Sequence, residues 1–384
     1  MKRGTLMPTA NTIRSLAIAL AMTGLALATT GATLHSASAD DFYREDLRIP
    51  TVSAGPRGLE AMLVRPSGTR RYPLALLSHG APRDAGMRAG MTPKGLYSQA
   101  IEFARRGFAV LVVMRRGYGA SGGNYAENSG PCDRRNYLIA AKASASDLRA
   151  AIEAVKNRTD VTTRGMIAVG VSAGGFASVA LTADPPPDLA AAISFAGGRG
   201  SRADNDVCDE DALARAFGVL GKTSRTPMLW VYAQNDKFFA PRLAHRLHAE
   251  FSAAGGRAEF IDAPAFGSDG HALFSAAGAS IWIPIVDRFL REQNLGTRDL
   301  IAAPIVAALP PPPGLGTKGR EGFAAYLVSG PHKAFAASRK GGFAYRTGLR
   351  SASEAQQAAL AECAKYAPDC ALVAVDDERV GSSR

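Results

Sequence analysis

A serine between glycines stands where an apolar run gives way to a helical pattern. Residues 166–171 predict a strand, and Gly-Val-Ser-Ala-Gly follows at 170–174, with Ser172 at its centre. Small glycines let the backbone turn sharply, so such a turn presents a hydroxyl, and N–H groups at the helix start face developing negative charge. The five letters alone also occur in ordinary glycine-rich turns. After an apolar strand, they favour a nucleophile.

A serine nucleophile needs a base, and histidine, with a reference pKa near ~6.5, suits this role around neutral pH. His271 is the candidate because it lies in a loop after the last predicted core strand. His79 belongs to a turn, where we expect a structural role. His245 and His248, three residues apart on a predicted helix, could share a metal ion, but the sequence offers no third ligand. We therefore expect no metal site and no organic cofactor.

A carboxylate should hold the histidine in one tautomer and stabilise the imidazolium as it forms. Asp236 follows the predicted strand that ends near Tyr232, and it is our candidate. Asp269 is the rival, because it lies two residues before His271. We expect Asp269 to shape the loop instead.

The elements that must position these residues alternate between strands and helices from about 58 to 293, a pattern typical of a mostly parallel sheet. An edge strand is expected at 59–64. Core strands are expected at 74–78, 109–114, 166–171, 191–195, 228–232 and 258–261. Apolar residues three and four apart predict helices at 96–106, 145–155, 175–181, 241–253 and 279–291. Segment 197–226 is long enough for a small cap over the site, or it forms a plain solvated excursion.

These landmarks together resemble the α/β-hydrolase superfamily, and its dienelactone-hydrolase-like branch in particular, over about residues 58–293. His-Gly-Ala at 79–81 resembles the oxyanion turn of that family, and 115–122 resembles its glycine-rich loop. The chain order of Ser172, Asp236 and His271 is also the family's. The resemblance implies a mostly parallel twisted sheet with helices on both faces. It also implies an oxyanion hole formed by the backbone N–H groups of Ala81 and Ala173.

One departure concerns the nucleophile, since dienelactone hydrolases proper use a cysteine where this chain has Ser172. The serine favours a general ester or acyl hydrolase over a specialised lactonase.

Two stretches of the sequence resemble nucleotide-binding motifs but lack a feature that such motifs require. The G-x-G-x-x-G match at 117–122 is not followed by a helical pattern, and Gly-Lys-Thr at 221–223 lacks the first glycine of a P-loop.

The two ends of the chain differ from the alternating strands and helices expected at about 58–293. Residues 1–39 combine a basic start, an apolar run at 16–28 and Ala-Ser-Ala at 37–39, which predicts a cleaved export signal; an uncleaved membrane anchor is the alternative. The hydrolase domain is then expected at 40–299. A proline-rich linker at 300–319 is followed by a small α+β module at 320–384. In that module we expect strands at 323–328, 334–338, 342–345 and 370–375, and a helix at 353–366.

Four cysteines fit an exported chain, because disulfides persist outside the cytosol. Cys363 and Cys370 lie near a predicted helix end and strand start, so a local pair is expected, which leaves Cys132 for Cys208. A bond between Cys132 and Cys208 would brace the rim of the active site. Free buried thiols are the alternative.

Composition excludes several classes of function. The chain has 384 residues, 47% of them hydrophobic, which is typical of globular proteins. Its net charge is +11. These basic residues are dispersed and no nucleic-acid-binding module is recognisable, so a solvated surface is favoured over attraction to anionic envelope material.

The sequence therefore predicts a periplasmic or secreted serine hydrolase that cleaves small-molecule esters through an acyl-enzyme. It predicts neither nucleic-acid binding nor stable membrane insertion after signal cleavage. A serine peptidase of the same fold is the first alternative. The second is a non-catalytic envelope binding protein whose tail module makes the contacts. The sequence names no partner for that module.

Overall fold

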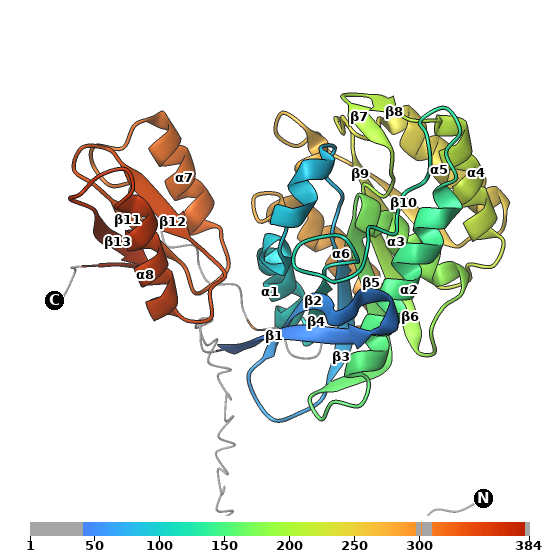
Figure 1. Ribbon diagram of the computed structural model, residues 1–384, viewed down its shortest axis with the longest axis horizontal. Coiled ribbons are helices and arrows are strands. Elements are labelled where there is room, and N and C mark those ends of the chain that lie inside the picture. The colour runs from blue at the N-terminus through green and yellow to red at the C-terminus, as the bar shows by residue number, and fades with distance from the viewer. Residues whose placement is uncertain (1–40, 297–300, 302–308, 381–384) are drawn as a thin grey trace, which may run out of the picture. The chain divides into compact units, whose positions relative to one another are not determined.

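The computed structural model describes residues 41–296, 301 and 309–380, so the predicted export signal at 1–39 lies outside the described residues. An eight-stranded sheet has the order β1-β2-β4-β3-β5-β6-β9-β10 (Figure 1). The two outer pairs, β1 with β2 and β2 with β4, are antiparallel, and every other neighbouring pair is parallel. The expected mostly parallel α/β sheet is confirmed.

The sheet is built from the predicted strands plus one that the sequence did not reveal. Its strands are β1 Phe42–Thr51, β2 Gly55–Pro66, β3 Tyr72–Ser78, β4 Ala109–Val113, β5 Val161–Val171, β6 Leu189–Phe195, β9 Met228–Ala233 and β10 Ala258–Ala263. The prediction that 59–64 is the edge strand was wrong, because β1 lies outside it. In β1 only Phe42 and Ile49 are buried, so this strand carries no alternating apolar pattern.

Helices cover both faces of the sheet (Figure 1). They are α1 Tyr97–Arg105, α2 Tyr137–Val155, α3 Ala173–Ala183, α4 Glu210–Gly221, α5 Pro241–Ala253 and α6 Ala279–Glu292. On β3, Leu74 and Leu76 join the core that also contains residues of α2 to α5, whereas Ala75 and Leu77 join the core of α1 and α6. Alternate side chains of a strand point to opposite faces, so each core is filled by every second residue.

The segment at 197–226 divides into two parts. Strands β7 Ser201–Ala203 and β8 Asp206–Val207 form a two-stranded hairpin. Helix α4 follows, and its Leu213 and Phe217 are fully buried in the core. The helical part of the predicted cap is therefore a core helix, and only the hairpin remains as loop-like structure.

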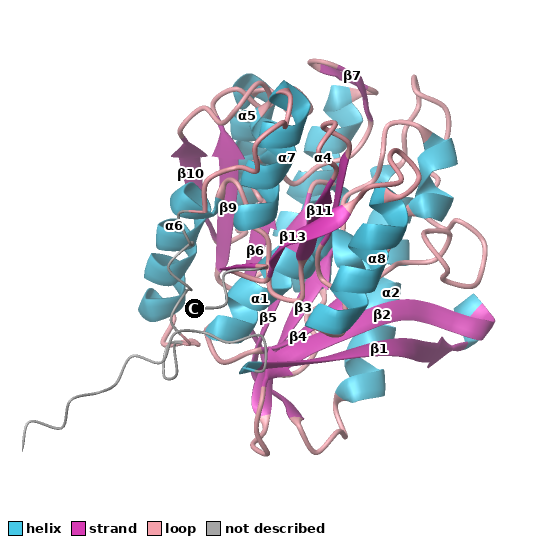
Figure 2. Cartoon of the chain, turned by 90° about the vertical axis from the view of Figure 1, so that its left-hand side faces the viewer, coloured by secondary structure: helices cyan, strands magenta, loops and turns pink. Residues whose placement is uncertain are grey.

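The C-terminal module has its own four-stranded antiparallel sheet, ordered β12-β11-β13-β14. Figure 2 labels its strands β11 and β13 and its helices α7 and α8. Its elements are α7 Thr317–Leu327, β11 Ala334–Ala337, β12 Phe343–Arg346, α8 Ala352–Cys363, β13 Ala371–Val375 and β14 Glu378–Arg379. Small residues of β11 pack with α8, whereas Phe335 packs with Phe323 and Tyr326 of α7. The expected α+β module is present.

Three predictions for this part of the chain differ from the structure. Residues 323–327 of the strand expected at 323–328 belong to α7, where Phe323 and Tyr326, three residues apart, share one buried helix face. Because α7 begins at Thr317, the last three residues of the expected linker are helical. Helix α8 is capped by Ser351, whose side chain accepts a hydrogen bond from the Glu354 N–H, so it begins before the expected Ser353.

None of the helices in the described ranges is long and apolar enough to cross a bilayer.

Candidate active site

Ser172 occupies a strained turn between β5 and α3. Its backbone has φ 56° and ψ −121°, a left-handed region that residues with a side chain seldom adopt. The flanking glycines are required by close contacts. A Cβ at Gly170 would lie 2.1 Å from the Gly174 carbonyl oxygen, and one at Gly174 would lie 2.0 Å from that of Ser78. The sequence Gly-x-Ser-x-Gly therefore forms a sharp turn that presents the serine.

The turn after β3 passes directly beside this serine. A Cβ at Gly80 would lie 3.2 Å from the Ser172 Cβ, and Ala81 and Ala173 line one pocket with Ser172. Within the described chain, the N–H groups of Ala81 and Ala173 donate to no protein acceptor. Two backbone donors beside a serine hydroxyl are what an oxyanion hole requires.

His79 holds this turn from inside. Its Nδ1 lies 2.6 Å from the Gly80 carbonyl oxygen, and its Nε2 accepts from the Arg115 N–H at 3.1 Å. Burial, together with the neighbouring Arg115 charge, lowers the pKa of His79 to about 3. The ring is therefore neutral at neutral pH, with its proton on Nδ1.

Arg115 secures the same turn with its side chain. The guanidinium Nη1 donates to the Ser78 hydroxyl at 2.7 Å and to the His79 carbonyl at 2.9 Å, and the side chain is fully buried. Its Nε pairs with Glu127. The turn that would stabilise an oxyanion is thus fixed by a buried cation.

Asp236 and His271 meet at the carboxyl ends of neighbouring strands. Asp236 follows β9, and His271 lies in a short 3-10 turn after β10. The His271 Nδ1 is 3.0 Å from the Asp236 Oδ2, and the carboxylate is buried. Its Oδ1 accepts from the Phe238 and Phe239 N–H groups at 2.7 and 2.8 Å. These bonds fix the carboxylate and, through it, the imidazole.

The His271 ring also packs against the pocket wall. It stacks on Phe238, with ring centroids 3.9 Å apart, and it touches Phe239 edge-on. A Cβ at Gly198 would lie 2.6 Å from the Phe239 ring, and the Gly198 N–H donates to the Ser172 carbonyl at 3.1 Å. Phe239 therefore packs between the His271 ring and the Ser172 turn.

The contacts among the three candidate residues therefore differ. Asp236 and His271 are in direct contact, while Ser172 shares its pocket with the two phenylalanines that touch His271. In the described chain the Ser172 hydroxyl makes no hydrogen bond to His271. Such bonds are often long without substrate and tighten in the complex.

Asp269 contacts backbone only. Its Oδ1 accepts from the His271 N–H at 2.9 Å and from the Lys237 N–H at 3.0 Å. It links the loops that carry Asp236 and His271.

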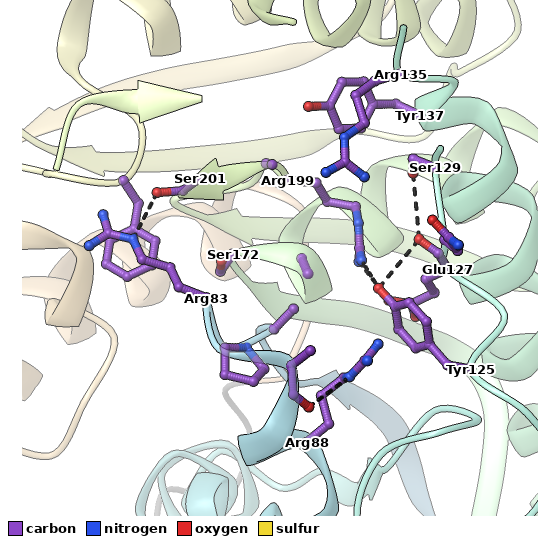
Figure 3. A pocket seen from close by; sticks show the side chains of 18 of the residues that line it. Arg83, Arg88, Tyr125, Glu127, Ser129, Arg135, Tyr137, Ser172, Arg199 and Ser201 are labelled. Atoms are coloured by element: carbon purple, nitrogen blue, oxygen red, sulfur yellow. Dashed lines mark hydrogen bonds and ion pairs between the residues drawn. The ribbon is translucent and has the colours of Figure 1, made fainter. Parts of the chain in front are cut away.

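The pocket at Ser172 has a volume of about 340 Å³. Four arginines line it, and sequence reasoning missed all of them: Arg83, Arg88, Arg135 and Arg199 (Figure 3). Tyrosines and one acid, Glu127, complete the polar wall. They come from loops after different strands, so no spacing in the sequence connects them.

Glu127 is the centre of a buried ionic network. Besides Arg115, it pairs with Arg199 at 2.5 Å and accepts from the Tyr118 hydroxyl at 3.0 Å. Burial alone would raise the pKa of Glu127, but Arg115 and Arg199 lower it to about 2. The carboxylate is therefore ionised at neutral pH.

Both disulfides join the expected cysteines, Cys132 with Cys208 and Cys363 with Cys370. The first links two pocket-lining segments, one with Ser129 and Arg135 and the other with Ser201. All four cysteines of the chain are paired.

His245 and His248, the two histidines three residues apart, each contact a different group. His245 contacts Asp262 at 3.1 Å, and the His248 ring is 3.0 Å from the Ala258 carbonyl oxygen. In the described part of the chain, no three His, Cys, Asp or Glu side chains are grouped to hold a metal ion.

Comparison with known proteins gives one family match. The model of the X-Pro dipeptidyl-peptidase (S15) family matches residues 57–237. A search of curated proteins finds no match.

Similar solved structures include two esterases and a peptidase. An esterase of Pyrococcus furiosus is 13% identical, with a TM-score of 0.46, over 66% of this chain and 91% of its own. An esterase of Thermogutta terrifontis is 20% identical, with a TM-score of 0.44, over 65% and 93%. An acylaminoacyl peptidase of Pyrococcus horikoshii is 12% identical, with a TM-score of 0.46, over 67% and 42%.

The fold is assigned from the arrangement of strands and site residues in this chain. Parallel strands, a strained serine turn between β5 and α3, and an acid and a histidine after β9 and β10 follow the order of one fold. This arrangement is that of an α/β-hydrolase fold, and the family model matches residues 57–237 of it.

Proposed function

We propose that this protein is a serine hydrolase that cleaves carboxylic esters, with Ser172 as nucleophile, His271 as base and Asp236 as its orienting partner. The observation that carries the proposal is the 3.0 Å contact of His271 Nδ1 with Asp236, beside the pocket that contains Ser172. With Nδ1 bound to the carboxylate, the free Nε2 is the atom that can accept the serine proton.

The reaction has two balanced halves. The Ser172 oxygen bonds to the ester carbonyl carbon while its proton moves to His271, and the N–H groups of Ala81 and Ala173 bind the oxyanion. Collapse breaks the carbon–oxygen bond to the alcohol, which leaves with the proton from His271. Water then attacks the acyl-enzyme in the same way and releases the acid.

A peptidase is the second candidate, because the family match is to X-Pro dipeptidyl-peptidases. An enzyme that removes dipeptides must accept a free α-ammonium group close to its nucleophile. Here four arginines and a single carboxylate line the pocket, and that carboxylate is already paired with two guanidinium groups. This charge balance disfavours a cationic substrate and favours esters without an amine.

Labelling by a fluorophosphonate probe tests the proposal. Wild-type protein should label and the Ser172→Ala variant should not, and the variant should lose at least about a thousandfold in kcat on short-chain esters. An X-Pro anilide measured beside these esters separates peptidase from esterase. Folded wild-type protein that neither labels nor cleaves esters would favour a non-catalytic binding protein.

We also propose export to the periplasm or the medium. The basic and apolar pattern of residues 1–39 supports it, and so do the two disulfides. Protein recovered from an export-competent bacterial host should have Asp40 as its first residue. Recovery of the full-length chain from the cytosol would contradict this proposal.

A further inference from the structure

The pocket beside Ser172 has more positive charge than its own carboxylates neutralise. Arg199 pairs with Glu127, and Arg83 pairs with Asp204 at 2.9 Å. Arg88 and Arg135 make no ion pair within the described chain. Because Glu127 also pairs with Arg115, it has no capacity left to neutralise either of them.

Arg135 and Arg88 both retain unused donors. In the described chain, the only acceptor of the Arg135 guanidinium is the Cys208 sulfur, 3.7 Å from Nη2, and its buried Nε has none. The Arg88 guanidinium lies over the Tyr125 ring, 3.8 Å from the centroid, and only its Nε donates, to the Ala85 carbonyl. Stacking on an aromatic ring leaves the edge of a guanidinium available for a planar anion.

These cations gather on one side of the nucleophile. In Figure 3, Arg88, Arg135 and Arg199 lie on one side of Ser172, and Arg83 lies on the other. Arg83 stacks on Phe238, the same ring that stacks on His271. The three arginines are therefore on the side away from the wall that carries the histidine.

That placement distinguishes the two halves of an ester. His271 must protonate the departing alcohol, so the alcohol belongs on the side of Phe238. The acyl group then extends toward Arg88, Arg135 and Arg199. A carboxylate on the acyl chain would meet guanidinium groups there, and hydrogen bonds between charged groups are stronger than those between neutral groups.

We propose that the preferred substrates are monoesters of short dicarboxylic acids, whose free carboxylate is bound on the side of the pocket that Arg88, Arg135 and Arg199 line. This inference rests on the proposed esterase function of the same site. The cavity of about 340 Å³ limits the acyl chain to a small molecule. Hydrolysis forms and breaks the same bonds as above, and the second carboxylate does not react.

Three esters of similar size test the proposal. Monoethyl succinate has its carboxylate in the acyl half. Its isomer 3-(propanoyloxy)propanoate has the ester reversed, so that the carboxylate is in the alcohol half, and ethyl pentanoate has none. With acid release followed by titration at constant pH, kcat/KM should be at least about tenfold higher for monoethyl succinate than for each of the others.

Substitution of the arginines identifies the groups responsible. Arg135→Gln and Arg88→Gln should each reduce the ratio of kcat/KM for monoethyl succinate to that for ethyl pentanoate by about tenfold, mainly through KM. Two variants are needed because one could impair folding. Arg257→Gln is the matched control, since Arg257 directly precedes β10, is exposed and does not line the pocket. It removes the same charge and should leave the ratio unchanged.

The outcomes separate the two proposals. If wild-type protein cleaves ethyl pentanoate as well as monoethyl succinate, the anionic preference is wrong and the esterase remains. If the reversed isomer is preferred, the carboxylate belongs to the alcohol half and the acyl assignment is overturned. If no ester is cleaved and no fluorophosphonate label forms, the proposed function itself fails. If Arg257→Gln lowers the ratio of kcat/KM values as much as the two pocket variants do, the effect is a general one of charge, and the assignment to Arg88 and Arg135 is overturned.

Discussion

At the scale of single residues, two carboxylates near His271 make different contacts. Asp236 bonds to the imidazole itself, whereas Asp269 bonds only to backbone N–H groups. When the carboxylate that holds the imidazole is lost, the histidine adopts the wrong tautomer. This change lowers the catalytic rate far more than it lowers the stability of the fold.

We therefore expect Asp236→Asn to reduce kcat by about 10³-fold to 10⁴-fold while the protein remains folded. An Asn side chain keeps an acceptor for the Phe238 and Phe239 N–H groups, which favours a folded variant. Steady-state kinetics and near-ultraviolet circular dichroism check both parts. Asp269→Asn is the matched control, and a larger kcat loss there would make Asp269 the acid.

His79 predicts how stability depends on pH. Its pKa is about 3 in the folded chain against 6.5 in the unfolded chain, so below pH 6.5 the unfolded state binds a proton that the folded state does not. The free energy of unfolding should therefore fall with decreasing pH, by about 1.4 kcal/mol per pH unit for this proton. Its contribution is complete above pH 6.5 and is lost toward pH 3.

Urea unfolding at several values between pH 7 and pH 4.5 measures this slope. The window stops at pH 4.5 because Glu127, whose pKa is lowered to about 2, adds its own loss of stability below that value. His79→Gln should show a slope smaller by about one proton. Equal slopes in the two proteins would mean that His79 is protonated in the folded state.

At the scale of elements, the Cys132–Cys208 bond joins two segments that form the pocket wall. Removing it in Cys132→Ser/Cys208→Ser should lower the free energy of unfolding by about 2–4 kcal/mol. KM should rise several-fold because Arg135 and Ser201 lose their mutual alignment. Cys363→Ser/Cys370→Ser is the control, since that pair lies in the C-terminal module. Unchanged KM in the first variant would contradict the role in alignment.

The sequence revealed those elements whose pattern is local. The core strands after residue 70 were predicted, and most of them are buried and apolar, although β10 is only half-buried. Gly170 and Gly174 marked the turn at Ser172. Strand β1 was missed because its two buried residues, Phe42 and Ile49, do not form an alternating apolar pattern. Helix α7 was taken for a strand because FAAYLV is a short apolar run, which fits both structures.

The candidate site was predictable only in part. Fold order implied that Ser172, Asp236 and His271 end at one edge of the sheet, and the structure shows the Asp236 contact with His271. Of the four pocket arginines, Arg88 lies in the short 3-10 helix Ala85–Gly90 and the other three lie in loops. The lengths and backbone paths of the loops determine which loops meet at the pocket. No periodicity in the sequence predicts these paths.

At the scale of the whole molecule, the residues proposed for chemistry all lie between 81 and 271. The hydrophobic clusters of the large sheet and those of the C-terminal module share no residue. We propose that residues 40–299 form an independent catalytic domain and that the module at 320–384 has a separate role.

A chain ending at residue 301 should therefore keep kcat/KM for a given ester within about twofold of the full chain. Kinetics of the two proteins at equal concentration check this, with circular dichroism to establish that the shorter chain is folded. A folded but inactive short chain would make the module part of the catalytic unit.

The position of Arg115 limits how this enzyme can adapt. The same guanidinium contacts the Ser78 and His79 turn and the Glu127 carboxylate that also binds Arg199. A change at Arg199 or Glu127 would reach the backbone donors at Ala81. Arg88 and Arg135 stand outside these contacts, so natural variation or directed evolution toward new acyl groups should act there first.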